Sequence, residues 1–359
     1  MRSDPVQFEA CASLDALPDD ADALFAANPG LYCRHAWWRT VLAHGIPPGS
    51  EPVLLVGRVG GRSAALFPLR RDPDGALSSL TTPYTCLYQP LLDPALDAAT
   101  LQRMLTAFAR WCRTAAVTRL EPLDPEWPAF ATCVRAARRV GLIPLRFDAF
   151  GNWHEDVHGL DWNRYLAGRP GALRETIRRR LRRAEREARF ELVRDGAGVE
   201  AGIAAYEQVY ARSWKEKEPF PQFNPALMRA GAAEGWLRLG LMWIGQQPAA
   251  AQLWVLDQGV ASVLKLAHDE AFKALSPGTA LTAWMLRRLL DEEHVRGIDF
   301  GRGDDAYKQD WTGGRRQRAG LLLANPARPA SWPLLIRHLA GAVLRRTNLP
   351  PRPRGRREF

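Results

Sequence analysis

Hydrophobic and polar positions form strand-like patterns in three consecutive segments of the second half of the chain. These segments are residues 237–244, 249–256 and 261–268, and short polar turns separate them. After the third segment, apolar residues recur from Leu281 to Leu290 with the spacing of an amphipathic helix. The pattern therefore predicts three strands followed by one long helix.

Both ends of this helix carry residues that favour helix termini. Ser276 and Pro277 precede the apolar positions, and a proline in the first turn is typical of a helix start. Gly297 marks the expected end of the helix. Residues 298–300 are then expected to form a short strand, which leads into the polar residues at 301–305.

The first half of the chain predicts a second α/β module. Alternating apolar and polar residues on both sides of Gly60-Gly61 predict a β-hairpin with these glycines in its turn. We find no phosphate-cradling turn in this half, so we expect it to support the structure or to bind substrate. The expected helices are residues 13–27, 34–43, 99–115 and 127–140, and the expected strands are residues 52–59, 63–68, 80–92, 120–123 and 142–147.

The length of 359 residues exceeds what a single hydrophobic core usually organises. We therefore expect an α/β (α+β) protein of two modules, each with a mixed central sheet flanked by helices. The expected divisions are an N-terminal module at residues 1–160, a basic helical connection at 161–189, a second module at 190–330, and a basic amphipathic helix with a disordered tail at 331–359.

The net charge of +10 is concentrated in two segments. Residues 174–189 contain eight Arg and three Glu, and residues 345–359 contain six Arg and one Glu, so each segment carries +5. The near-neutral remainder argues against a general nucleic-acid-binding surface. Segment 174–189 is either a solvated helix face or a docking site for an anionic partner: CoA phosphate, an acyl carrier protein, tRNA or a membrane.

The last predicted helix, residues 332–346, is amphipathic and basic. A packed terminal helix with a disordered tail is the favoured interpretation, and a helix lying on anionic lipid is the alternative. No apolar run approaches the roughly 18 residues that span a bilayer. The acidic start is unlike a signal peptide, and the five Cys include no CxxC pair. We expect a cytoplasmic protein, soluble or peripheral on the inner face of the membrane.

His154, Glu155 and His158 match the HExxH pattern of zinc proteases. On a helix, the two His would share one face and bind zinc, with Glu155 as a base. Here glycines flank the motif, and alternation through residues 153–157 favours a strand. We therefore expect no metal site.

The candidate chemistry depends on one succession of elements: a strand, a Ser/Gly-containing turn and a helix. Unpaired backbone N–H groups and the positive end of the helix dipole meet at the start of the helix, where a pyrophosphate can bind. The next strand brings acidic side chains beside that anion site. This arrangement would hold an activated acyl group next to a base.

Two segments in this region, KLAHDEAFKALSPG from Lys265 and DFGRGDDAYKQDW from Asp299, resemble the GNAT superfamily of acyltransferases and within it the CelD-like and FemAB-like branch. The resemblance covers about residues 205–325 strongly and the first half weakly. It implies two GNAT-like modules in tandem. It also implies acyl-CoA (acetyl-CoA) or an acyl carrier protein as the donor, without a metal.

The resemblance further implies a role for Tyr307, which would protonate the leaving thiolate. Asp299 or Asp304 is the expected base or the anchor for a substrate ammonium group, and His268 is a further candidate base because of its intrinsic pKa. The expected pyrophosphate cradle consists of backbone amides, and the expected acceptor-binding side chains lie in two loops. The cradle residues are Ser276, Gly278, Thr279 and Ala280, and the acceptor-binding candidates are Trp214, Phe220, Arg302 and Lys308.

These residues predict transfer of an acyl group from a thioester to an amine or hydroxyl of a sugar, a polysaccharide precursor or an envelope component. A FemAB-type transfer from aminoacyl-tRNA and a catalytically inactive GNAT scaffold are the alternatives. For Trp214 and Phe220 the alternative role is ordinary packing. For Arg302 and Lys308 it is ion pairing with neighbouring aspartates.

Overall fold

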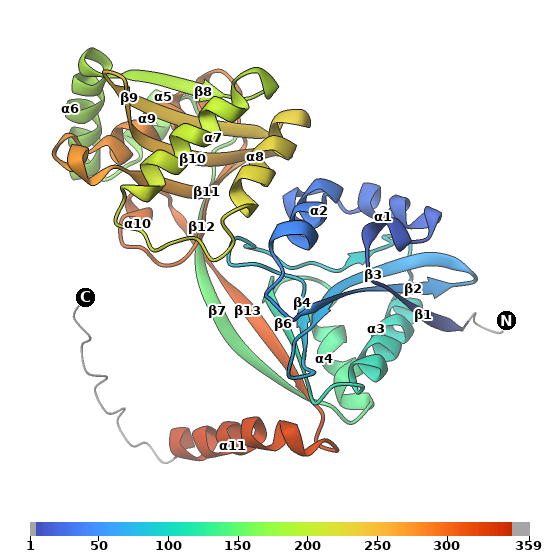
Figure 1. Cartoon of the computed structure of the whole chain (residues 1–359). Helices are drawn as coiled ribbons and strands as arrows, with labels where there is room; N and C mark the ends of the chain where they lie inside the picture. The colour runs from blue at the N-terminus through green and yellow to red at the C-terminus, as the bar shows by residue number, and fades with distance from the viewer. Residues whose placement is uncertain (1–4, 347–359) are drawn as a thin grey trace.

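The computed structural model describes residues 5–346, in which the strands form one continuous mixed sheet flanked by helices (Figure 1). The expected α/β fold is confirmed. The strand order is β1-β2-β3-β4-β6-β13-β7-β12-β11-β10-β9-β8, and β5 pairs with β3 beside this path. The strands are β1 (Val6–Cys11), β2 (Glu51–Val59), β3 (Arg62–Arg71), β4 (Leu77–Ser79), β5 (Leu91–Leu92), β6 (Val117–Leu123), β7 (Ile143–Asp156), β8 (Arg189–Val193), β9 (Leu237–Ile244), β10 (Gln247–Asp257), β11 (Val260–His268), β12 (Gly297–Arg302) and β13 (Gly314–Ala324). The helices are α1 (Asp22–Ala27), α2 (His35–His44), α3 (Ala98–Cys112), α4 (Phe130–Arg139), α5 (Trp162–Ala167), α6 (Gly171–Glu187), α7 (Gly196–Ala211), α8 (Phe223–Ala233), α9 (Pro277–Asp291), α10 (Lys308–Trp311) and α11 (Trp332–Arg346).

β7 and β13 join the two halves of the chain. They pair antiparallel, and β13 also pairs with β6 of the first half, whereas β7 also pairs with β12 of the second half. Figure 1 shows them as two long strands that run from one lobe to the other. A strand from the end of the chain thus completes the sheet of the first half. The division of the chain at residues 160 and 190 stays a prediction.

Segments with clear hydrophobic periodicity form the expected elements. The three strands before the long helix are β9, β10 and β11, and the hairpin is β2–β3, with Gly60 and Gly61 at φ of +56° and +79° in its turn. β7 continues to Asp156, beyond the expected end at residue 147, because its last residues pair with β12 and β13. Local periodicity predicted strand structure at residues 142–147 and 153–157 but did not join the two segments, because the pairing partners lie far along the sequence.

The long helix, α9, begins at Pro277 as the sequence predicts, but it ends at Asp291, well before Gly297. The chain turns back at this point, where the amide of Val295 donates to the carbonyl of Leu289 over 3.2 Å. Gly297 is instead the first residue of β12, and a Cβ at this position would lie 3.3 Å from Cγ2 of Val260. The glycine therefore allows β11 and β12 to approach each other and does not end the helix.

The two halves pack against each other through aromatic side chains. Phe223 at the start of α8 is fully buried, and its ring lies 5.6 Å from Trp37 of α2 and 4.5 Å from Tyr84 in centroid distance. The structure places Phe223 in the core between the halves, because α8 folds back onto α2.

In the terminal helix, α11, the apolar side chains on one face are exposed between residues 332 and 340, the part whose side chains the structure describes, which contradicts the favoured prediction of a packed helix. Trp332, Ile336 and Leu339 lie on one helical face and are 52%, 65% and 65% exposed. Figure 1 shows α11 separated from both lobes. Sequence periodicity predicts an apolar face but not whether the fold offers a surface to cover it. The predicted disordered tail, beyond residue 346, lies outside the described residues.

Helix α6 carries the Arg-rich segment. Its apolar residues Ile177 and Leu181 are buried toward α9, and most of its arginines face solvent. Arg183 pairs with Glu187 along the helix at 2.8 Å. The exposed face fits the solvated interpretation and remains accessible to an anionic partner. Among the described residues, no helix has the length and apolar content needed to cross a bilayer.

Candidate functional site

The site is organised by a gap between β11 and β12. These parallel strands pair only from Val260 to Ser262, opposite Gly297 to Asp299, and then separate. Beyond the paired segment, Gly301 has φ of +67°, and a Cβ there would lie 2.8 Å from the carbonyl oxygen of Val263. Only glycine fits this position without strain. The separation opens one edge of β11 beside the start of α9.

One cavity, of about 390 Å³, lies at the start of α9, and we call it the α9 pocket. Ser276, Gly278 and Thr279 line it together with His268 of β11 and Tyr307. The amide of Ser276 donates to Lys273, and the amide of Ala280, a fully buried residue, donates to Ser276. This leaves the first-turn amides of Gly278 and Thr279 for an anion in the pocket.

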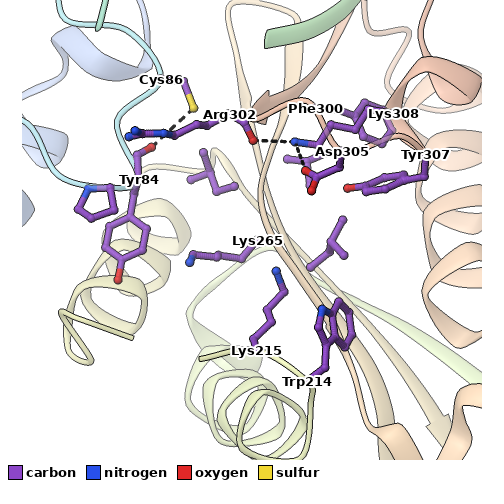
Figure 2. A pocket seen from close by; sticks show the side chains of 14 residues that line it. Tyr84, Cys86, Trp214, Lys215, Lys265, Phe300, Arg302, Asp305, Tyr307 and Lys308 are labelled. Carbon is purple, nitrogen blue, oxygen red and sulfur yellow. Dashed lines mark hydrogen bonds and ion pairs between the residues drawn. The ribbon is translucent and has the colours of Figure 1, made fainter. Parts of the chain in front are cut away.

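A second cavity, of about 290 Å³, lies where the two halves meet, and we call it the central pocket (Figure 2). Tyr84 and Cys86 of the first half line it, so this half contributes directly to the site. The second half supplies Lys215 from the loop after α7, Lys265 from β11, and the segment after β12. The central pocket and the α9 pocket share Trp214, Leu266 and Tyr307.

Tyr307 therefore lies at the junction of the two pockets, immediately before α10, with 39% of its surface exposed. Its ring meets Phe300 of β12 edge-on at 6.5 Å. The surrounding protein, and to a smaller extent the carboxylate of Asp305, raise the pKa of the Tyr307 hydroxyl above its usual value. The hydroxyl consequently keeps its proton at neutral pH and can donate it.

Comparisons with known proteins agree with this geometry. Residues 171–309 match the sequence model of a family described as an acetyltransferase (GNAT) domain. FemX has a TM-score of 0.59 at 10% identity, covering 87% of this chain and 96% of that chain. A tandem GNAT protein from the clavulanic acid biosynthesis pathway has a TM-score of 0.52 at 15% identity, covering 89% and 99%. The C-terminal domain of a putative lysylphosphatidylglycerol synthetase from Agrobacterium fabrum has a TM-score of 0.54 at 13% identity, covering 88% and 93%.

The chain has a tandem, FemAB-like GNAT fold. The likeness to these solved structures concerns the fold alone, because the identities are low, and a search of curated proteins found no match. The GNAT domain match covers α6 to the start of α10, which includes the α9 pocket and the gap beside β11. The protein therefore carries a GNAT domain of the acyltransferase type.

Of the expected GNAT bases, His268 alone lines the α9 pocket, and none lines the central pocket. Its ring lies 4.4 Å from that of Trp214, and its Nε2 lies 3.3 Å from Oε1 of Glu270, outside hydrogen-bond geometry. Burial lowers the pKa of His268, which keeps the imidazole neutral at pH 7. A neutral imidazole at this position is able to accept a proton.

Asp299 and Asp304 line neither the α9 pocket nor the central pocket. Asp299 accepts hydrogen bonds from Asn152 and from the amide of Gly301, both at 2.7 Å, and it pairs with Arg316. Asp304 forms a bidentate pair with Arg315 at 2.7 and 2.8 Å. This hydrogen-bonded pair lowers the pKa of Asp304, which makes it a weaker base. Both carboxylates therefore hold the ends of strands together.

The acceptor-binding candidates occupy different positions. Trp214 lines both pockets, whereas Phe220 is half-buried against the core and lines neither. Lys308 is 3% exposed and donates to the carbonyl of Arg302 at 2.7 Å, so it fixes the loop that carries Tyr307. Arg302 lines the central pocket and stacks over the ring of Phe150 at 4.4 Å.

Sequence reasoning did not identify Tyr84, Lys215 and Lys265 as pocket residues. A lysine in the middle of the apolar strand β11 was a signal for Lys265, because charged residues are seldom placed there without a partner. Tyr84 carried no such signal. Its position in the central pocket depends on the contact between the two halves.

The HExxH residues lie on and just after β7, as the alternation indicated. Glu155 forms an ion pair with Arg169 and accepts a hydrogen bond from the amide of Gly313 at 2.8 Å. Among the described residues, no cluster of three or more His, Cys, Asp or Glu is arranged to hold a metal. Glu155 thus has a structural role, closing the end of β7 against α5 and β13.

Replacing Glu155 by Gln is expected to lower the free energy of unfolding by about 2 kcal/mol. The side chains of Arg169 and Glu155 are only 9% and 17% exposed, so loss of the carboxylate leaves a poorly solvated guanidinium without its partner. Urea unfolding measures the change. Asp156→Asn, at the exposed neighbouring residue, is the control and should change stability by less than about 0.5 kcal/mol. Equal stabilities of the two variants would refute the structural role.

Proposed function

We propose that the protein transfers an acyl group, acetyl in the simplest case, from a thioester to an amine or hydroxyl. The observation that carries this proposal is the position of Tyr307, at the junction of an anion-binding helix start and a second, polar pocket. The α9 pocket suits the diphosphate of CoA, or the phosphopantetheine of an acyl carrier protein, through the amides of Gly278 and Thr279. The central pocket then receives the acceptor.

In the proposed reaction, the acceptor nitrogen or oxygen attacks the thioester carbonyl carbon, and the carbon–sulfur bond breaks. The sulfur leaves with the electron pair of that bond and takes the proton of the Tyr307 hydroxyl. The proton lost by the acceptor passes to His268, which is neutral and lies beside Trp214 at the junction. Exchange with solvent then restores both side chains.

The acceptor class that we propose is a sugar, a polysaccharide precursor or another cell-envelope component, in the cytoplasm. FemX and the lysylphosphatidylglycerol synthetase domain share the fold, and the name of the latter indicates action on a lipid. The polar lining of the central pocket supports a hydrophilic acceptor. Lys215 and Lys265 supply N–H donors there, and Tyr84 donates its hydroxyl to Glu218, the partner of Lys265.

A second candidate is aminoacyl transfer from charged tRNA. The likeness of the fold to FemX and the exposed arginines of α6 favour it. Calorimetry with acetyl-CoA, longer acyl-CoAs, acylated carrier protein and aminoacyl-tRNA separates the donors. We expect acyl-CoA or acylated carrier protein to bind and to release thiol. Salt-dependent tRNA binding without CoA binding would support the second candidate instead. Absence of thiol release from every thioester donor, together with absence of aminoacyl transfer from tRNA, would support an inactive scaffold.

We also propose that α11 lies on an anionic membrane surface. Its exposed apolar face carries Trp332, Ile336 and Leu339, its polar face carries Arg337, and residues 345–359 add a charge of +5. Burial of the apolar face among lipid acyl chains, together with attraction of the basic residues to anionic headgroups, stabilises such a position. This charge complementarity favours lipid over a second copy of the same basic helix.

The double substitution Ile336→Glu and Leu339→Glu is expected to weaken binding to phosphatidylglycerol-containing vesicles at least about tenfold, because it places charge on the apolar face. Co-sedimentation with vesicles measures this, and phosphatidylcholine vesicles should bind poorly. Ile143→Glu, at an exposed apolar residue of β7, is the matched control and should bind like the wild type. A dimer that only the double substitution disrupts, seen by sedimentation velocity, would argue against the membrane.

A further inference from the structure

The central pocket contains more positive charge than its carboxylates balance. Lys215, Lys265, Arg302 and Lys308 line it, and the lining includes one carboxylate, that of Asp305. Figure 2 shows the side chain of Lys215 extending toward that of Lys265, whereas Lys308 points to Asp305 and to the carbonyl of Arg302. An excess of positive charge in a confined pocket favours an anionic ligand. Whether each cation is already paired with a carboxylate therefore decides how much charge remains for a ligand.

Two of the four cations are neutralised inside the protein. Lys265 lies 2.7 Å from Oε1 of Glu218, and Glu218 also accepts a hydrogen bond from the hydroxyl of Tyr84. Lys308 lies 2.9 Å from Oδ2 of Asp305. These two pairs hold the walls of the central pocket and contribute no net charge to it.

The other two cations have no such partner. Within the described residues, neither Lys215 nor Arg302 forms an ion pair, and both instead contact aromatic rings. The ammonium of Lys215 lies 5.4 Å from the centroid of the Trp214 ring, and the guanidinium of Arg302 lies 4.4 Å from that of Phe150. The half-buried Lys215 is thus held beside a second ammonium, that of Lys265, without a carboxylate of its own.

Without a ligand, this arrangement raises the free energy of the charged form of Lys215. Burial, and then the charge of Lys265, lower the pKa of Lys215, so its charged form lacks the stabilisation that it would have in water. An anion in the central pocket would remove that cost. The same anion would meet the donors of Arg302, which suit planar carboxylates and phosphates.

We propose that the acceptor carries a phosphate or carboxylate, which Lys215 and Arg302 bind while the nucleophilic group lies at Tyr307. The proposal rests on the proposed acyl transfer, because it assigns the central pocket to the acceptor. A phosphorylated sugar and a sugar acid share this chemistry. An uncharged sugar of the same size lacks the anionic group.

The test is calorimetry of the full-length protein with glucosamine 6-phosphate, glucuronate and glucosamine. We expect one or both of the charged sugars to bind at least about tenfold more tightly than glucosamine. Lys215→Met should remove about tenfold of that affinity. It should leave the melting temperature unchanged or higher, because it deletes an unpaired cation. Lys217→Met, at an exposed lysine outside the central pocket, is the matched control and should bind like the wild type.

The outcomes separate this inference from the acyl transfer itself. Equal affinity for glucosamine and the charged sugars, or no binding of either charged sugar, would overturn the inference. The inference would also be overturned if Lys215→Met lost acetyl-CoA binding but kept binding of the charged sugar. Lys215 would then belong to the donor site. Anionic sugar binding without any binding of an acyl donor would instead overturn the proposed function. The relative affinities for glucosamine 6-phosphate and glucuronate identify the anion.

Discussion

Gly278→Asp is expected to weaken acetyl-CoA binding at least about 100-fold, a loss of roughly 2.7 kcal/mol, with the fold intact. The new carboxylate would enter the α9 pocket, where we place the diphosphate of the donor, and repel it. The fold tolerates the substitution because the nearest atom to an added Cβ is Nδ1 of His268, at 3.7 Å. Aspartate in a first helical turn is also favourable to the helix dipole. Calorimetry with acetyl-CoA measures the effect.

Gly278→Asn is the matched control, since it adds a side chain of the same size without the charge. It should bind acetyl-CoA more weakly than the wild type but clearly better than Gly278→Asp. Thermal unfolding of both variants verifies that neither has lost the fold. Unchanged acetyl-CoA affinity in Gly278→Asp would remove the start of α9 from the donor site, and with it the basis of the proposed reaction.

Tyr307→Phe is expected to lower kcat by about 10²- to 10³-fold and to change acetyl-CoA affinity by less than about threefold. The substitution deletes the proton donor for the leaving sulfur, and general-acid catalysis contributes effects of this size. Phenylalanine keeps the edge contact with Phe300, so the loop before α10 should hold its position. Thiol release measured in a single turnover isolates the chemical step from product release.

Tyr210→Phe is the control for this substitution. Tyr210 donates to the carbonyl of Glu216 at 3.1 Å and lines neither the α9 pocket nor the central pocket, so its loss should leave kcat nearly unchanged. Because the pKa of Tyr307 is raised, the wild-type rate should also show no loss from its ionisation below pH 10. A fully active Tyr307→Phe enzyme would exclude Tyr307 as the acid.

The strongest sequence predictions concern segments whose structure depends on neighbouring residues. The hairpin around Gly60-Gly61, the strands β9 to β11 and the start of α9 at Pro277 follow from local periodicity and turn chemistry. The resemblance over residues 205–325 indicated the GNAT fold, and the α9 pocket contains the predicted Ser276, Gly278 and Thr279. The sequence predicted the hairpin, the strands and the helix start because interactions within a few residues determine such local elements.

The predictions that needed contacts between separate elements were incomplete. Asp299 and Asp304 stand in a segment that resembles a GNAT motif, yet Arg316 and Arg315 of β13 bind them away from the pockets. The exposed α11 had a clear amphipathic pattern, but that pattern is the same for a packed helix and for a membrane-bound one.

By itself, the sequence determined the local elements, the Ser-Pro-Gly start of α9 and the presence of Tyr307 close behind β12. Tertiary structure alone decided that Tyr84 would meet Lys215 and Lys265 in one pocket, and that two of the four cations there would lack carboxylates. The physical reason is that periodicity and capping act over one or two turns of chain. The shape of the central pocket instead depends on contacts between distant segments, such as that between Tyr84 and Glu218, which lie 134 residues apart.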